Sequence, residues 1–143
     1  MKSDVLIARM VRAVNIAARP FTRELEKKHD ISLNAWRCLR CLVTDGDVNS
    51  AGVLSDRTGL DKMSTSRALK ELEGKKLVSR VRSSEDRRRY CIDVSRKGHE
   101  LVDILMPDAL ARADLMLKPL TQAQRKALAQ ALDCIIEHAR SEE

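Results

Sequence analysis

The stretch RVRSSEDRRRYCIDV, residues 80–94, gathers five arginines around a short polar segment. On both sides of this segment apolar and polar residues alternate, which is the period of a β-strand with one buried face. The pattern predicts a β-hairpin. Its loop, SSEDRRR, is longer than a tight turn and is expected to project into solvent. The hairpin would therefore carry its positive charge to a protruding tip.

The charge of the whole chain is concentrated around this hairpin. The chain has 143 residues and a formal net charge of +6. Residues 57–89 contain eleven basic and five acidic residues, a difference of +6, so the rest of the chain sums to zero. A positive field confined to one segment is typical of a protein that binds a polyanion. We therefore expect nucleic acid as the partner.

The residues before the hairpin predict a helix-turn-helix. Residues 50–75 indicate two short helices, with Gly59 in the turn between them and Asp61 as the cap of the second helix. A helix-turn-helix followed at once by a basic hairpin is a winged helix. In that fold the second helix enters the major groove of DNA, while the hairpin tip reaches the backbone or the minor groove.

The remaining segments predict long helices. Aromatic residues make up only 2% of the chain, and aliphatic residues that favour helix packing supply the apolar content. Apolar spacing indicates helices over about 4–28 and 33–43 and two more after Ser95, and Ser32 is expected to cap the second helix. Pro20 is expected to kink or divide the first helix, and Pro107 to bend the helix that follows Ser95. The fold class expected is therefore mainly α, with a small β-hairpin wing.

The outer helices have too little chain around them to bury their apolar stripes in a monomer. Pairing with a second copy would cover these stripes in a symmetric interface. We therefore expect residues 31–95 to form the winged helix-turn-helix domain. Residues 1–30 and 96–143 are expected to form a helical dimerisation region.

The segment DRRRYCIDVSRKG resembles the wing signature of the multiple antibiotic resistance regulator (MarR) family: Asp, any residue, Arg, five residues, Leu-Thr, two residues and Gly. Three positions match it, namely Asp86, Arg88 and Gly98. Val94 and Ser95 stand where Leu and Thr are usual, but Val can still face a core and Ser can still cap a helix. The resemblance extends to residues 60–80 and to the terminal helices.

The resemblance implies DNA contacts from the second helix of the helix-turn-helix and from the hairpin tip. On the helix the implied residues are Lys62, Ser64, Thr65, Arg67 and Lys70. At the tip they are Arg87, Arg88 and Arg89, with Asp86 orienting an arginine by an ion pair.

The resemblance also implies an effector. Members of the family commonly bind small aromatic acids or related anions in a cleft between the dimer helices and the DNA-binding lobe, so the partner would be anionic or phenolic. An aromatic face with nearby polar and cationic groups would come from Asn15, Arg19, Trp36 and Arg40.

Cys38 and Cys41 have the C-x-x-C spacing, but no second ligand pair accompanies them, because Cys91 and Cys134 are isolated and the histidines form no spaced cluster. We expect both thiols to be buried as small apolar groups, with no metal and no cofactor. A redox- or metal-responsive sensor that uses this pair stays open as an alternative.

No catalytic motif is present in the sequence: it has no phosphate-binding glycine loop, no H-E-x-x-H and no nucleophile elbow, so we do not expect an enzyme. No apolar run is long enough to span a bilayer or to form a signal peptide, which favours a cytoplasmic protein without a membrane partner. The predicted function is a homodimeric repressor that binds a pseudo-palindromic DNA duplex and is released by an effector. A DNA-binding architectural protein without sequence preference is the other alternative.

Overall fold

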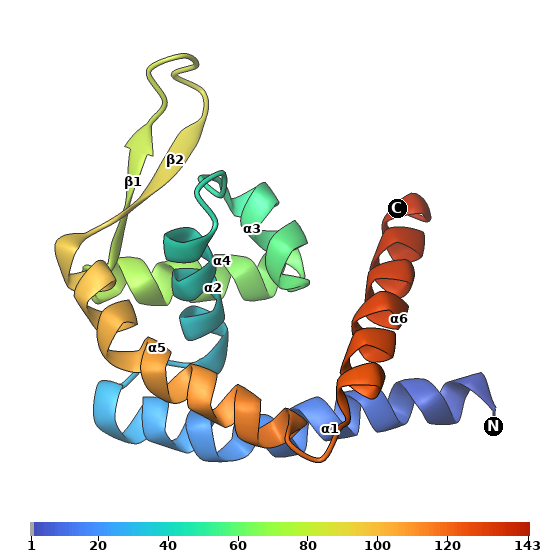
Figure 1. Ribbon diagram of the computed structural model, residues 1–143. Helices are drawn as coiled ribbons and strands as arrows, with labels where there is room; N and C mark the ends of the chain where they lie inside the picture. The colour runs from blue at the N-terminus through green and yellow to red at the C-terminus, as the bar shows by residue number, and fades with distance from the viewer. Residues whose placement is uncertain (1) are drawn as a thin grey trace. The chain divides into compact units, whose positions relative to one another are not determined.

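The computed structural model describes residues 2–143 and consists mainly of helices with one two-stranded antiparallel sheet (Figure 1). The mainly helical class with a hairpin wing is therefore confirmed. In chain order the elements are α1 (Ser3–Glu24), the π-helix η1 (Leu25–His29), α2 (Leu33–Thr44), α3 (Ala51–Thr58), α4 (Lys62–Gly74), β1 (Val78–Arg82), β2 (Tyr90–Val94), α5 (Arg96–Leu117) and α6 (Gln122–Ser141).

The chain divides into two compact units, Met1–Pro107 and Asp108–Glu143. The division falls inside α5, next to Pro107, yet the helix continues through this residue. Helix α1 likewise continues through Pro20, so this proline does not divide the helix. The departure from α-helical geometry comes later in the chain, at η1.

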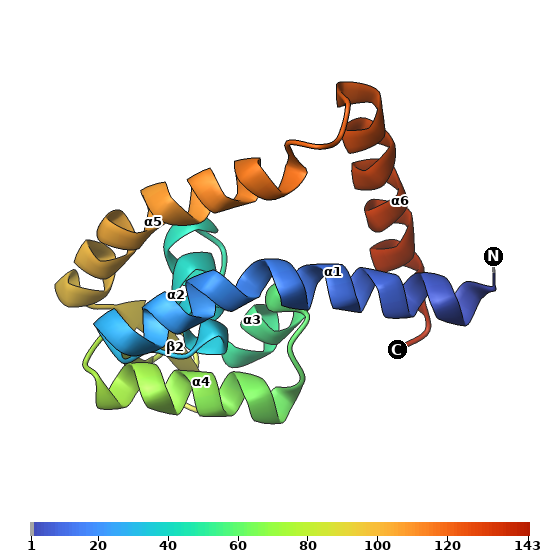
Figure 2. The same cartoon turned by 90° about the horizontal axis from the view of Figure 1, so that it is seen from below.

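The core of the first unit lies among α2, α3, α4 and η1. Its most deeply buried large side chains are Leu25, Ile31, Leu39, Leu54, Leu69 and Leu72. Each such side chain contributes roughly 1.5–3 kcal/mol through removal from water. Helix α4 runs in the same direction as α1 in both views, and its carboxyl end lies beside the base of β1 (Figures 1 and 2).

Side-chain caps fix where helices α2, α3 and α4 begin. Ser32, Ser50 and Asp61 each accept a hydrogen bond from the backbone N–H three residues later, at 3.1, 3.3 and 2.7 Å. Gly59 ends α3 with φ +70°, a left-handed conformation that glycine adopts without a side-chain clash. The caps expected at Ser32 and Asp61 and the turn expected at Gly59 are confirmed.

One carboxylate ties the start of α2 to α4. The backbone N–H and the hydroxyl of Ser32 donate to the two carboxylate oxygens of Glu71, each at 2.7 Å. Because a hydrogen bond to a charged group is stronger than one between neutral groups, this pair holds the two helices in register.

The hairpin is confirmed, with Val78 opposite Val94 at its base and Arg82 opposite Tyr90 at its outer end. The expectation of one buried face along its length is wrong. Burial stops midway along the hairpin, at Ile92, and beyond it Val81 and Tyr90 are 50% and 49% exposed. The reason is that the outer half of the hairpin extends beyond the helices (Figure 1).

The start of α5 is joined closely to the base of β1. The backbone N–H of Ser95 donates to the Leu77 carbonyl at 3.0 Å, and the Ser95 hydroxyl donates to the Lys76 carbonyl at 2.7 Å. The Ser95 oxygen also accepts from the Gly98 N–H at 3.1 Å, which confirms Ser95 as the cap of α5. A Cβ atom at Gly98 would overlap the Leu77 carbonyl and would lie 2.7 Å from Cγ1 of Val94.

Gly98→Ala is therefore expected to destabilise the fold by about 1–3 kcal/mol, because a methyl group cannot be placed without moving backbone atoms. The control is Gly46→Ala, where no atom lies within 4 Å of the added Cβ. Urea unfolding measures both variants. Equal stability of Gly98→Ala and the parent would contradict the close packing of α5 on β1.

Among residues 2–143, no helix combines the length and the apolar character needed to cross a bilayer.

Candidate nucleic-acid interface

Helix α4 presents a basic face on the side opposite its core residues. At 100° per residue, Lys62, Arg67 and Lys70 fall within an arc of about 140°, and all three are exposed. The buried residues Ala68, Leu69 and Leu72 lie on the other side. The outward arc is wide enough to follow a groove, and its cations are free to meet phosphate or base edges.

Met63 belongs to the same arc and is 67% exposed. The sequence reasoning missed this residue, because it looked for charged and hydroxyl groups. Helical geometry could have placed it, because at 100° per residue Met63 lies between Lys62 and Arg67 around the helix and so faces the same way.

Two of the predicted contact residues, Ser64 and Thr65, use their hydroxyl groups to bond to Asp61, the residue that caps the start of α4. Thr65 is 1% exposed and its hydroxyl donates to the Asp61 carbonyl at 2.9 Å, so its prediction as a DNA contact is wrong: the side chain faces the core. Ser64 is half-buried, and its hydroxyl lies 3.2 Å from the Asp61 carboxylate. The backbone N–H of Ser64, which donates to that carboxylate, holds the pKa of Asp61 below its usual value.

The hairpin tip is ordered by Asp86. Its carboxylate accepts from the backbone N–H of Arg88 at 2.9 Å, and its carbonyl accepts from the N–H of Arg89 at 2.9 Å. The ion pair that Asp86 makes is with Arg89, at 3.9 Å and exposed to solvent. A surface pair of this length contributes little stability, so the turn is held mainly by the backbone hydrogen bonds. Arg87 and Arg88 are exposed, so their charged groups face solvent.

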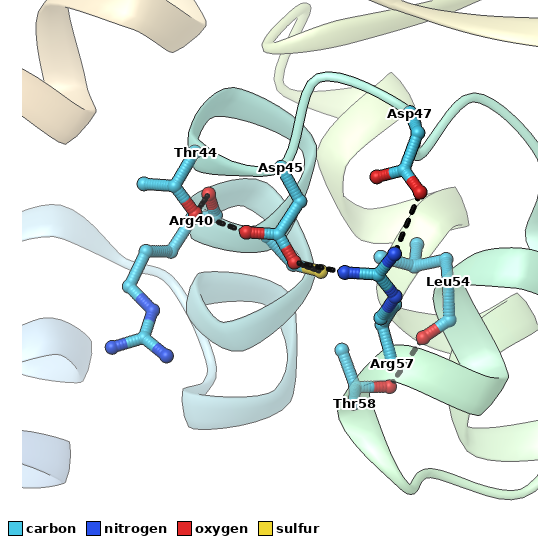
Figure 3. Close-up of polar contacts among 8 residues, drawn as sticks. Arg40, Thr44, Asp45, Asp47, Leu54, Arg57 and Thr58 are labelled. Atoms are coloured by element: carbon cyan, nitrogen blue, oxygen red, sulfur yellow. Dashed lines mark hydrogen bonds and ion pairs between the residues drawn. The ribbon is translucent and has the colours of Figure 1, made fainter.

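Ion pairs neutralise some of the eleven basic residues in the segment 57–89. Arg57 is held between Asp45 and Asp47, at 3.2 and 2.6 Å (Figure 3). Lys75 pairs with Asp30 at 2.8 Å, and Arg80 pairs with Glu73. Within residues 2–143, no acidic group lies within ion-pair distance of the basic residues that remain, which are Lys62, Arg67, Lys70, Lys76, Arg82, Arg87 and Arg88. The unpaired charge therefore collects on α4 and the wing.

The four predicted effector residues do not line one cavity. Asn15 and Arg19 line a groove of about 550 Å³ along α1. Arg40 lines a separate cavity of about 220 Å³ between α2 and α3. Trp36 is 3% exposed and packs edge-on against Phe21, with ring centroids 5.7 Å apart, so it is a core residue in this structure, and its contact with an effector stays a prediction.

The cysteine pair, Cys38 and Cys41, belongs to α2 and is buried in the core of the first unit. Burial raises the pKa of Cys38 to about 12, with a smaller contribution from Cys41. Burial and then the Asp45 carboxylate raise the pKa of Cys41 to about 11. A raised pKa lowers the fraction of thiolate, which is the reactive form, so both groups are poor nucleophiles at neutral pH. No set of three or more His, Cys, Asp or Glu side chains among the described residues is placed to hold a metal ion.

The thiols are expected to differ in their reaction with iodoacetamide at pH 8. Cys134, which is exposed, should be alkylated first. Cys38 and Cys41 should stay unmodified until urea unfolds the protein, because about one in ten thousand and one in a thousand of these groups are ionised at that pH. Peptide mass spectrometry measures the order. Fast alkylation of Cys41 in the folded protein would instead favour the alternative of a redox-responsive sensor that uses this thiol.

Comparison with known proteins gives one family and several similar structures. A family model described as the MarR family matches residues 29–89. A MarR/EmrR family transcriptional regulator from Acinetobacter sp. ADP1 is 26% identical, covers 99% of both chains and superposes with a TM-score of 0.86. AbsC from Streptomyces coelicolor, a MarR family regulator, is 19% identical over 99% of this chain and 97% of its own, with a TM-score of 0.83.

A third similar structure is BpsR from Bordetella bronchiseptica, whose DNA binding is described as regulated by 6-hydroxynicotinic acid. It is 18% identical, covers 91% of this chain and 97% of its own, and has a TM-score of 0.77. No curated protein sequence matches this chain.

Proposed function

Since this chain belongs to the MarR family, whose members are transcription regulators and not enzymes, we propose that it is a homodimeric repressor of transcription. In this proposal it binds a pseudo-palindromic DNA duplex and is released by a small anionic effector. The observation that carries the proposal is the unpaired positive charge on α4 and on the hairpin tip.

In this proposal the exposed residues of α4 and those of the wing contact different parts of the DNA. Arg67 and Lys70 on α4 would face the major groove, where base edges can be read. Arg87 and Arg88 at the hairpin tip would meet phosphates or the minor groove, whose negative potential attracts arginine. In a dimer two such lobes would contact half-sites about one helical turn apart, roughly 34 Å.

Exposed apolar side chains on the terminal helices support the dimer. Helix α6 has 20 residues and none of them is buried, although Leu128, Leu132, Ile135 and Ile136 share one side. Helix α1 also exposes apolar residues, among them Val5, Ile7, Val11 and Val14. A second copy would remove these surfaces from water, so we propose residues 1–30 and 96–143 as the dimerisation region and residues 31–95 as the DNA-binding domain.

Effector control is supported by the similarity to BpsR, whose DNA binding responds to a small aromatic acid. In this proposal the effector favours a spacing of the two recognition helices that does not match successive major grooves. Selection of bound sequences from a random duplex pool tests the proposal: the selected operator should bind roughly a thousandfold or more tightly than unrelated DNA. Equal affinity for all duplexes would favour an architectural DNA-binding protein instead.

Two substitutions separate base reading from phosphate contact. Arg67→Ala should weaken operator binding roughly 5- to 150-fold and relax base preference, because it removes a groove contact. Arg88→Ala should weaken binding to all duplexes and reduce the salt slope by about one, because it removes a phosphate contact. Fluorescence anisotropy across a salt series measures both.

The matched control for these variants is Arg96→Ala, which removes the same charge at the start of α5, outside α4 and the hairpin tip, where the guanidinium is paired with Glu100. Arg96→Ala should keep the operator affinity of the parent. If Arg88→Ala also kept it at every salt concentration, the hairpin tip would not contact DNA.

The dimer is tested on α6. Leu132→Asp combined with Ile136→Asp should raise the dissociation constant of the dimer at least about tenfold, because two carboxylates of each protomer would have to be desolvated in the interface. Light scattering coupled to gel filtration measures the mass. Gln130→Asp, about 200° around the helix from Leu132, is the control and should stay dimeric. A double variant that remained dimeric would place the interface elsewhere.

A further inference from the structure

We infer that Met63, on the outward face of α4, recognises the 5-methyl group of a pyrimidine in the major groove of the operator. In unmodified DNA this pyrimidine is thymine, whose methyl group is exposed in that groove. A 5-methylcytosine in the same position would present its methyl group in the same place. The inference rests on the proposed function, because it names what one residue of the proposed DNA-binding surface reads.

Met63 is unusually exposed for its chemistry. It is 67% exposed, more than any other large apolar side chain within residues 2–143. Packing inside the chain therefore buries little of it. A single exposed apolar residue is nevertheless common on protein surfaces, so exposure alone does not assign a role. The position of Met63 on the helix does.

Met63 lies at the centre of the face that α4 turns away from the core. The buried residues of this helix are Thr65, Ala68, Leu69 and Leu72. At 100° per residue, Met63 lies within about 10° of the direction opposite to their mean direction. Lys70 and Arg67 lie on either side of Met63, at about 20° and 40° around the helix. When these cations face DNA, Met63 therefore points to the floor of the groove, where the base edges are.

The place of Met63 along the helix also suits base contact. It is the second residue of α4, and the first turn of a recognition helix is the part that reaches base edges. Asp61 holds this turn: its carboxylate accepts from the Ser64 N–H at 2.7 Å, and its carbonyl accepts from the Thr65 hydroxyl at 2.9 Å. The backbone at Met63 is thus fixed before DNA binds, and only its side chain has to be ordered.

The thioether side chain matches a methyl group better than a hydrogen-bonding edge. Methionine has no donor and only a weak acceptor, so its favourable contact in the major groove is with the apolar group there, the methyl group of thymine. Its unbranched, polarizable chain adapts to the position of that group. Removing one methyl group from water is expected to improve affinity about fourfold, and two half-sites would give about fifteenfold.

Met63 would supply discrimination that the neighbouring cations do not. Arginine and lysine in the major groove bind best to the two acceptors of guanine. Neither gains from burying the methyl group of a T·A pair. Met63 and Arg67 lie four residues apart on one face, so they would read different bases of one half-site.

The binding test replaces thymine by deoxyuridine, which removes only the methyl group. Each thymine of the selected operator is replaced in turn, in both half-sites, and fluorescence anisotropy measures the affinity of the whole protein. At one position the parent should lose about tenfold or more. Met63→Gln should bind the thymine and uracil operators equally at that position, because an amide of similar length gains nothing from the methyl group. Met63→Leu, which stays apolar, should keep most of the difference.

The converse exchange adds a methyl group to cytosine at the same position. An operator with 5-methylcytosine there should bind the parent about tenfold more tightly than the same operator with cytosine, and Met63→Gln should not distinguish the two. Thymine and cytosine present different hydrogen-bonding groups in the major groove. A methyl effect in both contexts therefore assigns the contact to the methyl group.

Two variants control for indirect effects. Arg67→Ala should weaken operator binding yet keep the uracil effect at the Met63 position. Arg96→Ala, at the start of α5, should keep both the affinity and the uracil effect of the parent. Met63→Gln should also keep the salt dependence of the parent, because no charge is removed. Circular dichroism confirms that each variant is folded.

The outcomes separate this inference from the proposed function. If no thymine were sensitive to loss of its methyl group, or if Met63→Gln kept the sensitivity of the parent, the role of Met63 would be wrong. Such a result, together with a selected operator that still depends on Arg67, would leave the proposed function standing. A parent protein for which no operator can be selected would contradict the proposed function and the role of Met63 together.

Discussion

The arrangement of the winged-helix lobe depends on the contact between the first turn of α5 and the base of β1. Ser95 bonds to two consecutive carbonyls, and Gly98 lies so close to the Leu77 carbonyl that no side chain fits between them. This contact fixes the direction in which the hairpin leaves the helices. Because Leu77 also follows the end of α4, the same contact places the recognition helix, the wing and α5 at one junction.

Local signals were enough to predict most of the fold. Caps at Ser32 and Asp61, the glycine turn at 59 and the alternation of the hairpin act over a few residues, so a sequence shows them directly. The π-helix after α1 and the burial that stops halfway along the hairpin could not be predicted in this way. The apolar period of a helix does not distinguish a π-turn from an α-turn, and the alternation of a strand does not say where the strand leaves the packed helices.

The candidate site shows the same limit. Counting charges located the basic segment, but Arg57, Lys75 and Arg80 are neutralised by acidic groups elsewhere in the chain, and only a structure reveals which cations remain. Thr65 was misjudged because a hydroxyl on the recognition helix looks equally suited to DNA and to the helix start. Its place on the helix, in line with Leu69 and Leu72, was the signal that it faces inward.

One edge of the hairpin is hydrogen-bonded to a neighbouring segment, and the other edge is not. The N–H of Ile92 in β2 donates to the Asn49 carbonyl at 2.8 Å, which leaves β1 as the outer strand. An outer strand can pair with the same strand of another molecule and start aggregation. Arg82 lies on this strand and has no acidic group within ion-pair distance, so two such edges would repel each other if they met. Its charge therefore disfavours pairing between the strands of two molecules, a role that constrains the strand even where it touches no nucleic acid.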